Sequence, residues 1–166
     1  MKKLLAASVG VVFVVGLAYG MDPSFDTGDR KLDSTLEQLN TVARADPDGF
    51  VRRLSSMHNF PEQELRQARD TYGLGGADLF MATGLARETH RPVHSVAEEF
   101  KQNQGKGWGV IAQGLGIKPG SSEFHQLKRD AKGSLDYMES TAKSKQKHEQ
   151  KVKKASQGKG HAKSQS

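Results

Sequence analysis

The chain contains no cysteine among its 166 residues. Disulfides, a catalytic thiol, thiolate metal sites and a lipid anchor on cysteine are therefore excluded. No serine stands in a nucleophile-elbow pattern, and no helix carries an HExxH motif. The neighbouring carboxylates of Glu98 and Glu99 diverge around a helix, so they do not form a convergent acid–base pair. We expect no enzyme and no cofactor; a small hydrolase whose residues converge only in the fold remains an alternative.

Long apolar runs are scarce as well, and the one that is present stands at the start of the chain. Lys2 and Lys3 precede an apolar stretch from residue 4 to 17, and the small residues Ala18 and Gly20 follow it. This order is typical of a secretory signal peptide, and the run is short for a membrane span, which needs roughly 20 apolar residues. We expect cleavage after Gly20 and a periplasmic or secreted bacterial protein. An uncleaved membrane anchor is the alternative.

The net charge of +6 is distributed unevenly along the chain. Residues 21–127 carry 12 basic and 15 acidic side chains, whereas residues 128–166 carry 11 basic and 4 acidic ones. The chain therefore has a mildly acidic body and a basic tail, an asymmetry that points to an anionic partner or simply to a solvated end.

Apolar residues recur at helical spacing after residue 30, and no segment alternates like a strand for long. Asp46-Pro47, Pro61, Gly73 and Pro92 are typical helix boundaries. We predict an all-α fold: a compact bundle of six or seven short helices with a C-terminal helical extension and a disordered basic tail. The predicted segments are a signal peptide at 1–20, a flexible lead-in at 21–29, a helical domain at 30–130, a helical lysine-rich extension at 131–155 and a disordered tail at 156–166. The predicted core consists of Leu36, Leu39, Phe50, Leu54, Leu65, Phe80, Val96, Trp108, Ile111 and Leu115.

A glycine-rich stretch at 104–124, QGKGWGVIAQGLGIKPGSSEF, is the densest motif of the chain. Backbone amides at Lys106, Gly107 and Trp108, just before a helix, are candidates to bind an anion. The alternative is a tight connector in which glycine allows close helix approach and Trp108 fills the core. The stretch also has a helix-turn-helix rhythm, but Glu123 opens the second helix where a groove-reading helix would be basic or amide-rich. Sequence-specific DNA binding is therefore not expected.

The block from Asn103 to His125 resembles a motif of small exported bacterial proteins of unassigned activity, which reads N-G-K-G-W-G-x-I-A-x-x-L-G-I-K-P-G-S-x-E-F-H. The present chain has an extra Gln104 after the asparagine, and the similarity extends upstream through residues 46–60. The resemblance implies a helical exported protein and supplies no catalytic residue.

His90 and His94 stand four residues apart, a spacing that can place two metal ligands on one helix face. Pro92 lies between them and is expected to start a helix, so His90 would precede that helix. Two surface histidines are the simpler interpretation. A periplasmic protein that binds zinc, copper or nickel at these residues is an alternative function.

The basic tail suggests the favoured function. Cations attract anionic polymers and anionic membrane surfaces, whereas a solvated, repulsive terminus is the alternative. We expect a non-enzymatic exported binding or structural module whose tail contacts anionic envelope partners. The candidate contacts are Lys143, Lys145, Lys147, Lys151, Lys153 and Lys154.

Overall fold

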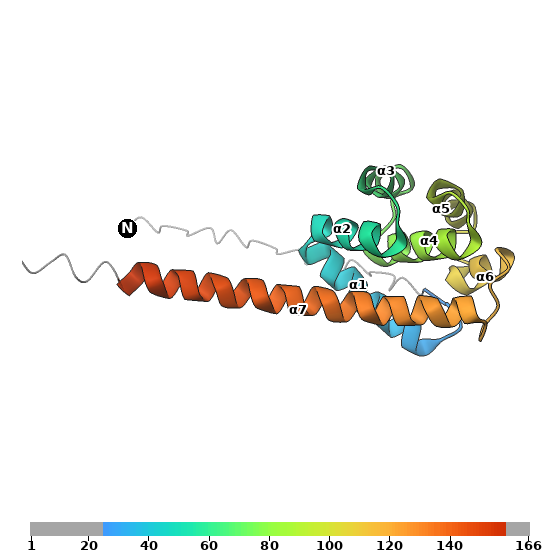
Figure 1. Cartoon of the computed structure of the whole chain (residues 1–166). Helices are drawn as coiled ribbons and strands as arrows, with labels where there is room; N and C mark the ends of the chain where they lie inside the picture. Colours follow the sequence, from blue (N-terminus) through green and yellow to red (C-terminus); the bar gives the residue numbers. More distant parts are fainter. Residues whose placement is uncertain (1–24, 159–166) are drawn as a thin grey trace, which may run out of the picture.

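The computed structural model describes residues 25–158, with side chains as far as Lys154, and within this range it is all-helical. The predicted all-α class is thereby confirmed. The predicted leader at 1–20 and residues 159–166 of the predicted tail lie outside the described residues. The helices, shown in Figure 1, are α1 (Arg30–Ala45), α2 (Pro47–His58), α3 (Glu62–Tyr72), α4 (Gly76–Thr89), α5 (Val93–Gln102), α6 (Gly107–Gly114) and α7 (Ser122–Gly158).

The helix ends follow the capping signals of the sequence. The Asp46 carboxylate accepts a hydrogen bond of 2.9 Å from the Gly49 amide, and Pro47 occupies the first position of α2. Gly73 ends α3 in the left-handed conformation, with φ of 67°. Pro92 immediately precedes α5. These local signals divide the chain because proline lacks an amide donor and glycine adopts positive φ without strain.

Helix α4 forms the centre of the body. It packs against α1, α2, α3, α5 and α7, and most of its residues, from Ala77 to Ala86, are buried. A helix that is apolar on several sides is stable only when neighbours surround it. All ten side chains predicted for the core are buried: Leu36, Leu39, Phe50, Leu54, Leu65, Phe80, Val96, Trp108, Ile111 and Leu115.

The first and last helices of the body, α1 and α7, point in the same general direction and cross obliquely (Figure 1). Lys128 of α7 pairs with Asp29 at the start of α1, and Lys145 Nζ lies 2.8 Å from the Asp46 carboxylate at the end of α1. The partners in both pairs are 99 residues apart in sequence, so the start and the end of α1 each meet a lysine of α7 in the same order along the chain. At 1.5 Å per residue, the two contacts lie about 25 Å apart along α7.

The body extends beyond the bounds predicted from sequence on both sides. Phe25, in the segment expected to be a flexible lead-in, is only 3% exposed and belongs to the core. Leu135 and Met138, in the predicted extension, are buried as well. The sequence pattern missed Phe25 because a single apolar residue in a polar, turn-rich segment has no periodicity to reveal it.

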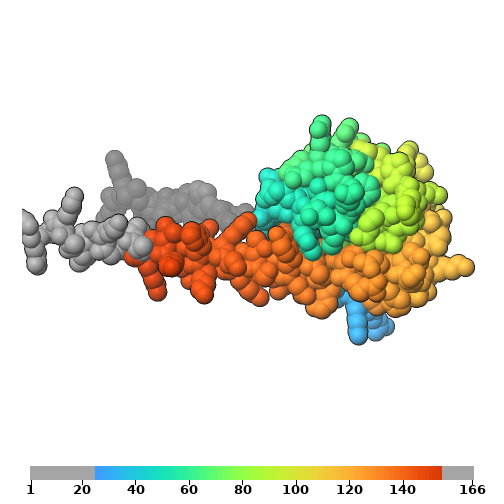
Figure 2. All heavy atoms as spheres, in the orientation of Figure 1, coloured from blue at the N-terminus to red at the C-terminus, as the bar shows by residue number. Residues whose placement is uncertain are grey.

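Helix α7 then leaves the body. It is 37 residues long, and its side chains from Ala142 to Lys154 are exposed. Figure 2 shows this half of the helix, in red, projecting past the compact part of the molecule. The part of the predicted extension from Ala142 onward is therefore the projecting continuation of α7, and the helix reaches Gly158 rather than residue 155.

Candidate functional site

The glycine-rich block joins α6 to the N-terminal segment of the body. The Trp108 amide donates a hydrogen bond of 2.7 Å to the Phe25 carbonyl, and the Gly109 amide donates one of 2.9 Å to the Asp26 carbonyl. The Lys106 ammonium group is bonded to the Asn103 side chain at 3.0 Å. Of the amides at the predicted anion site, those of Lys106 and Trp108 are already bonded to the protein's own carbonyl groups, at Asn103 and Phe25.

Glycine is required at this joint by the close approach of the chain. A Cβ atom placed on Gly109 would lie 2.7 Å from the Asp26 carbonyl oxygen, and one on Gly107 would lie 2.6 Å from Asp26 Cβ. Real Cβ atoms do not approach other atoms so closely. The arrangement is the tight connector that the sequence offered as the alternative to an anion site.

Trp108 completes the joint from inside the core. Its indole Nε1 donates a hydrogen bond of 2.9 Å to the carboxylate of Asp78 at the start of α4, and its ring stacks on Phe100 at a centroid distance of 4.6 Å. Burial raises the pKa of Asp78, while the indole hydrogen bond and the Gly75 amide act in the opposite direction. These contacts give the tryptophan a packing role.

The two histidines proposed as metal ligands lie on different elements. His90 ends α4 with φ of 55° and is exposed, whereas the His94 ring on α5 contacts the Tyr72 ring at 5.8 Å. Among residues 25–158, no group of three or more histidine, aspartate or glutamate side chains is arranged to hold a metal ion. The described part of the chain therefore brings no third ligand to this pair.

The lysines of α7 form a stripe along its projecting half. Lys143, Lys147, Lys151 and Lys154 follow one another at steps of four, four and three residues, which places them on one helix face. We call these four residues the lysine stripe. Lys143 is also within 3.7 Å of the Glu139 carboxylate. Lys145 and Lys153, the other two candidate contacts, lie on other faces of the helix.

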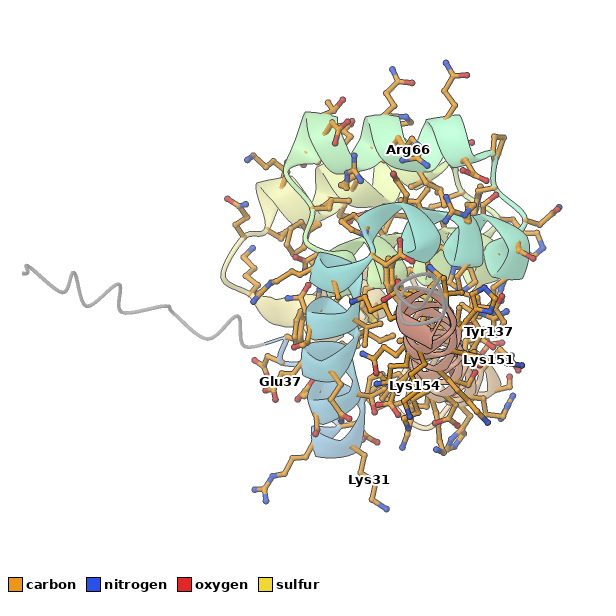
Figure 3. All side chains as sticks on the ribbon, turned by 90° about the vertical axis from the view of Figure 1, so that its left-hand side faces the viewer. Lys31, Glu37, Arg66, Tyr137, Lys151 and Lys154 are labelled. Atoms are coloured by element: carbon orange, nitrogen blue, oxygen red, sulfur yellow. The ribbon has the colours of Figure 1, made fainter. Side chains whose placement is uncertain are left out.

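The lysine stripe points away from the body. Leu127, Ala131 and Met138 mark the face of α7 that packs into the core, and helical geometry places the stripe on the opposite side. Figure 3 looks along α7 from its projecting end and shows Lys151 and Lys154 directed away from α1 and α2. The cations are therefore accessible to a partner that approaches from solvent.

A groove with a volume of about 320 Å³ lies between α2 and α7. Two arginines of α2, Arg52 and Arg53, line one side, and Tyr137 and Lys145 of α7 line the other. The Arg53 guanidinium lies over the Tyr137 ring, 4.5 Å from its centroid. Such a contact between a cation and an aromatic face is favourable. We call this feature the α2–α7 groove.

Positive charge exceeds negative charge in the α2–α7 groove. Its one carboxylate, Asp46, is hydrogen-bonded to Lys145 and to the Gly49 amide. These two bonds, that of Lys145 first, hold the pKa of Asp46 below its usual range. The three cations Arg52, Arg53 and Lys145 thus face a single carboxylate that is already engaged.

Sequence reasoning missed this groove. Arg52 and Arg53 stand next to each other in the chain, but nothing local links them to Tyr137 or Lys145, which follow more than eighty residues later. The contact arises only when α7 passes beside α2. The Arg-Arg pair was the one available signal.

Comparisons of the chain with models of protein families, with curated proteins and with solved structures find no match. Function must therefore be inferred from the charges and contacts of the chain itself. Within residues 25–158, no helix has an apolar stretch long enough to cross a bilayer.

Proposed function

We propose that this protein is an exported, non-enzymatic binding or structural module that contacts an anionic envelope polymer through the lysine stripe. The observation that carries the proposal is that the stripe continues as helix beyond the body, on the face directed away from the core. Export is inferred from the leader-like residues 1–20.

The spacing of the stripe favours a linear partner. Four ammonium groups are distributed along 12 residues, from Lys143 to Lys154, or about 17 Å of helix. A row of charges attracts a polymer with repeated anionic groups more strongly than it attracts a single small ion, because several contacts form together.

A polymer is favoured over a membrane surface by the lack of an apolar face beside the stripe. Amphipathic helices that lie in a membrane interface bury a broad apolar side. On the described part of α7 beyond Ala142, Val152 is the one large exposed hydrophobic side chain, at 54% exposure. The lysines therefore have little apolar support for insertion between lipids.

The test is retention on a heparin column, with heparin as a model anionic polymer. The variant carries Lys143→Gln, Lys147→Gln, Lys151→Gln and Lys154→Gln together. We expect it to elute at less than half the salt concentration that releases the unchanged protein, because screened electrostatic attraction supplies the binding.

A matched variant removes the same charge elsewhere. Its exposed substitutions are Lys31→Gln, Lys101→Gln, Lys118→Gln and Lys132→Gln. We expect it to elute close to the unchanged protein. Equal decreases in the eluting salt concentration for the two variants would show that net charge alone governs retention. That result would refute the proposal that the lysine stripe is the contact surface. Tighter binding to phosphatidylglycerol vesicles than to heparin would indicate that the partner is an anionic membrane surface and not a polymer.

A further inference from the structure

We propose that the α2–α7 groove is a binding site for one phosphate or sulfate group, held by Arg52, Arg53 and Lys145. This site lies on the body and is separate from the lysine stripe. It differs from the stripe in kind, because it would bind a single anionic group with defined stoichiometry rather than a length of polymer.

One unsatisfied donor of Arg53, its Nε–H, is the first support. Arg53 contacts Tyr137 through the face of its guanidinium group, which lies over the ring. Its Nε–H is buried and has no hydrogen-bond partner among the described residues. A buried donor without a protein acceptor is uncommon in native proteins. This nitrogen is closed off from solvent, so an anion in the groove bonds to it once the Arg53 side chain shifts. The edge of a guanidinium matches the oxygens of a phosphate or sulfate.

Arg52 is the second support. Its side chain lines the groove and is exposed, and it forms no ion pair with another described side chain. Its positive charge does contribute to lowering the pKa of Asp46 and of Asp48. The charge of Arg52 therefore acts on the Asp46 carboxylate in the groove, while the N–H donors of Arg52 remain available to a ligand.

Lys145 closes the opposite side of the groove. Its ion pair with Asp46 has side chains that are 59% and 39% exposed, so the ammonium group can also turn toward an added anion. Asp46 is held by the Gly49 amide as well and stays in place without Lys145. Three cations around one engaged carboxylate leave a positive potential that a doubly charged oxyanion would offset.

The remaining lining residues suit an ester rather than a bare ion. Hydroxyl groups of Ser56 and Thr141 and the ring of Tyr137 border the same space. With about 320 Å³, the groove has room for a sugar attached to the anionic group. A phosphorylated or sulfated sugar is thus the chemical class that uses all of these surfaces.

The experiment titrates the full-length protein with inorganic phosphate and, separately, with glucose 6-phosphate, followed by the backbone NMR signals of α2 and α7. We expect saturable shifts centred on residues 52–56 and 137–145. The ester should bind at least threefold more tightly than inorganic phosphate. Arg52→Gln with Arg53→Gln should weaken both affinities at least tenfold.

The control is Lys151→Gln with Lys154→Gln, which removes the same charge from the lysine stripe and should change either affinity less than twofold. Arg52→Gln alone alters an exposed side chain, so its expected threefold weakening is measurable even if the double variant folds poorly. NMR shifts that do not saturate would overturn the proposal of a specific anion site in the α2–α7 groove. Equal losses of affinity in the two double variants would overturn it as well. Equal affinity for phosphate and its ester would overturn the role of the sugar. Heparin retention in the same variants reports on the lysine stripe separately.

Discussion

At the scale of single residues, His58 is the titratable side chain most altered by the fold. Its Nδ1 lies 2.7 Å from Thr83 Oγ1, and that hydroxyl donates to the Leu79 carbonyl at 2.8 Å. Nδ1 must therefore carry the hydrogen and donate to the hydroxyl oxygen, which leaves Nε2 as a buried nitrogen without a partner among the described residues. Burial, aided by the positive charge of Arg87, lowers the pKa of His58 to about 3.

This lowered pKa predicts a loss of stability in mild acid. The unfolded chain takes up a proton at His58 below about pH 6.5, whereas the folded chain does so only near pH 3. The contribution of His58 to the free energy of unfolding is therefore fully present above pH 6.5, and it decreases as the pH drops toward 3. Between pH 7 and pH 5, we expect the free energy of unfolding to decrease by roughly 2 kcal/mol through this residue.

Urea unfolding at pH 7 and pH 5 measures the effect. His58→Gln should remove most of the decrease, relative to the variant's own stability at pH 7. His90→Gln changes an exposed histidine and should retain it. A decrease of the same size in both variants would show that other groups cause the acid sensitivity.

At the scale of elements, two glycines in helices predict opposite effects of one substitution. A Cβ atom added to Gly133 in α7 would meet nothing within 4 Å outside its own helix, whereas a Cβ on Gly109 in α6 would meet the Asp26 carbonyl. Gly133→Ala should stabilise the protein by up to about 1 kcal/mol, because alanine favours helix. Gly109→Ala should destabilise it by roughly 1–3 kcal/mol, because the N-terminal segment must shift.

Thermal and urea unfolding of the two variants measures whether each substitution raises or lowers the free energy of unfolding. Helix propensity alone would make both substitutions stabilising, so an increase in the stability of Gly109→Ala would contradict the docking of residues 25–27 onto α6. No change for Gly133→Ala would mean that α7 is already held by its packing at that point.

Local signals in the sequence were sufficient to predict the elements but not their pairing. The cap at Asp46, the end at Gly73 and the start after Pro92 depend on a few neighbouring residues, and all three were predicted. The contact of Arg53 with Tyr137 depends on how α2 meets α7. Periodicity reveals which face of a helix is apolar; it does not reveal which other helix covers that face.

The docked N-terminal segment shows the same limit at shorter range. The glycines before and after Trp108 were visible in the sequence, and a close approach was one interpretation of them. Which segment approaches was not visible, because the carbonyls of Phe25 and Asp26 are backbone groups that every residue carries. A backbone carbonyl can accept a hydrogen bond whatever side chain its residue carries, so the sequence does not indicate which carbonyl does so.

At the scale of the whole molecule, the projecting half of α7 should be dispensable for stability. Ending the chain after Gln146 keeps Lys145 and every buried side chain of the described part of α7. We expect its free energy of unfolding to stay within about 0.5 kcal/mol of the full chain. Ending the chain after Gly133 removes Leu135 and Met138 and should cost at least about 3 kcal/mol.

Urea unfolding of the two truncated chains distinguishes body from extension. A large loss of stability in the chain that ends at Gln146 would show that the projecting half packs on the body in solution. An unchanged stability in the chain that ends at Gly133 would place the boundary of the body before Leu135.

The packing of α1 against α7 has a consequence for the order of events during synthesis. Helix α1 leaves the ribosome early, yet the surface that covers it is encoded about a hundred residues later. Until that late segment emerges, α1 has an uncovered apolar side, and closure of so long a loop slows the final step. The body of the newly made polypeptide therefore stays incompletely folded until α7 has been synthesised.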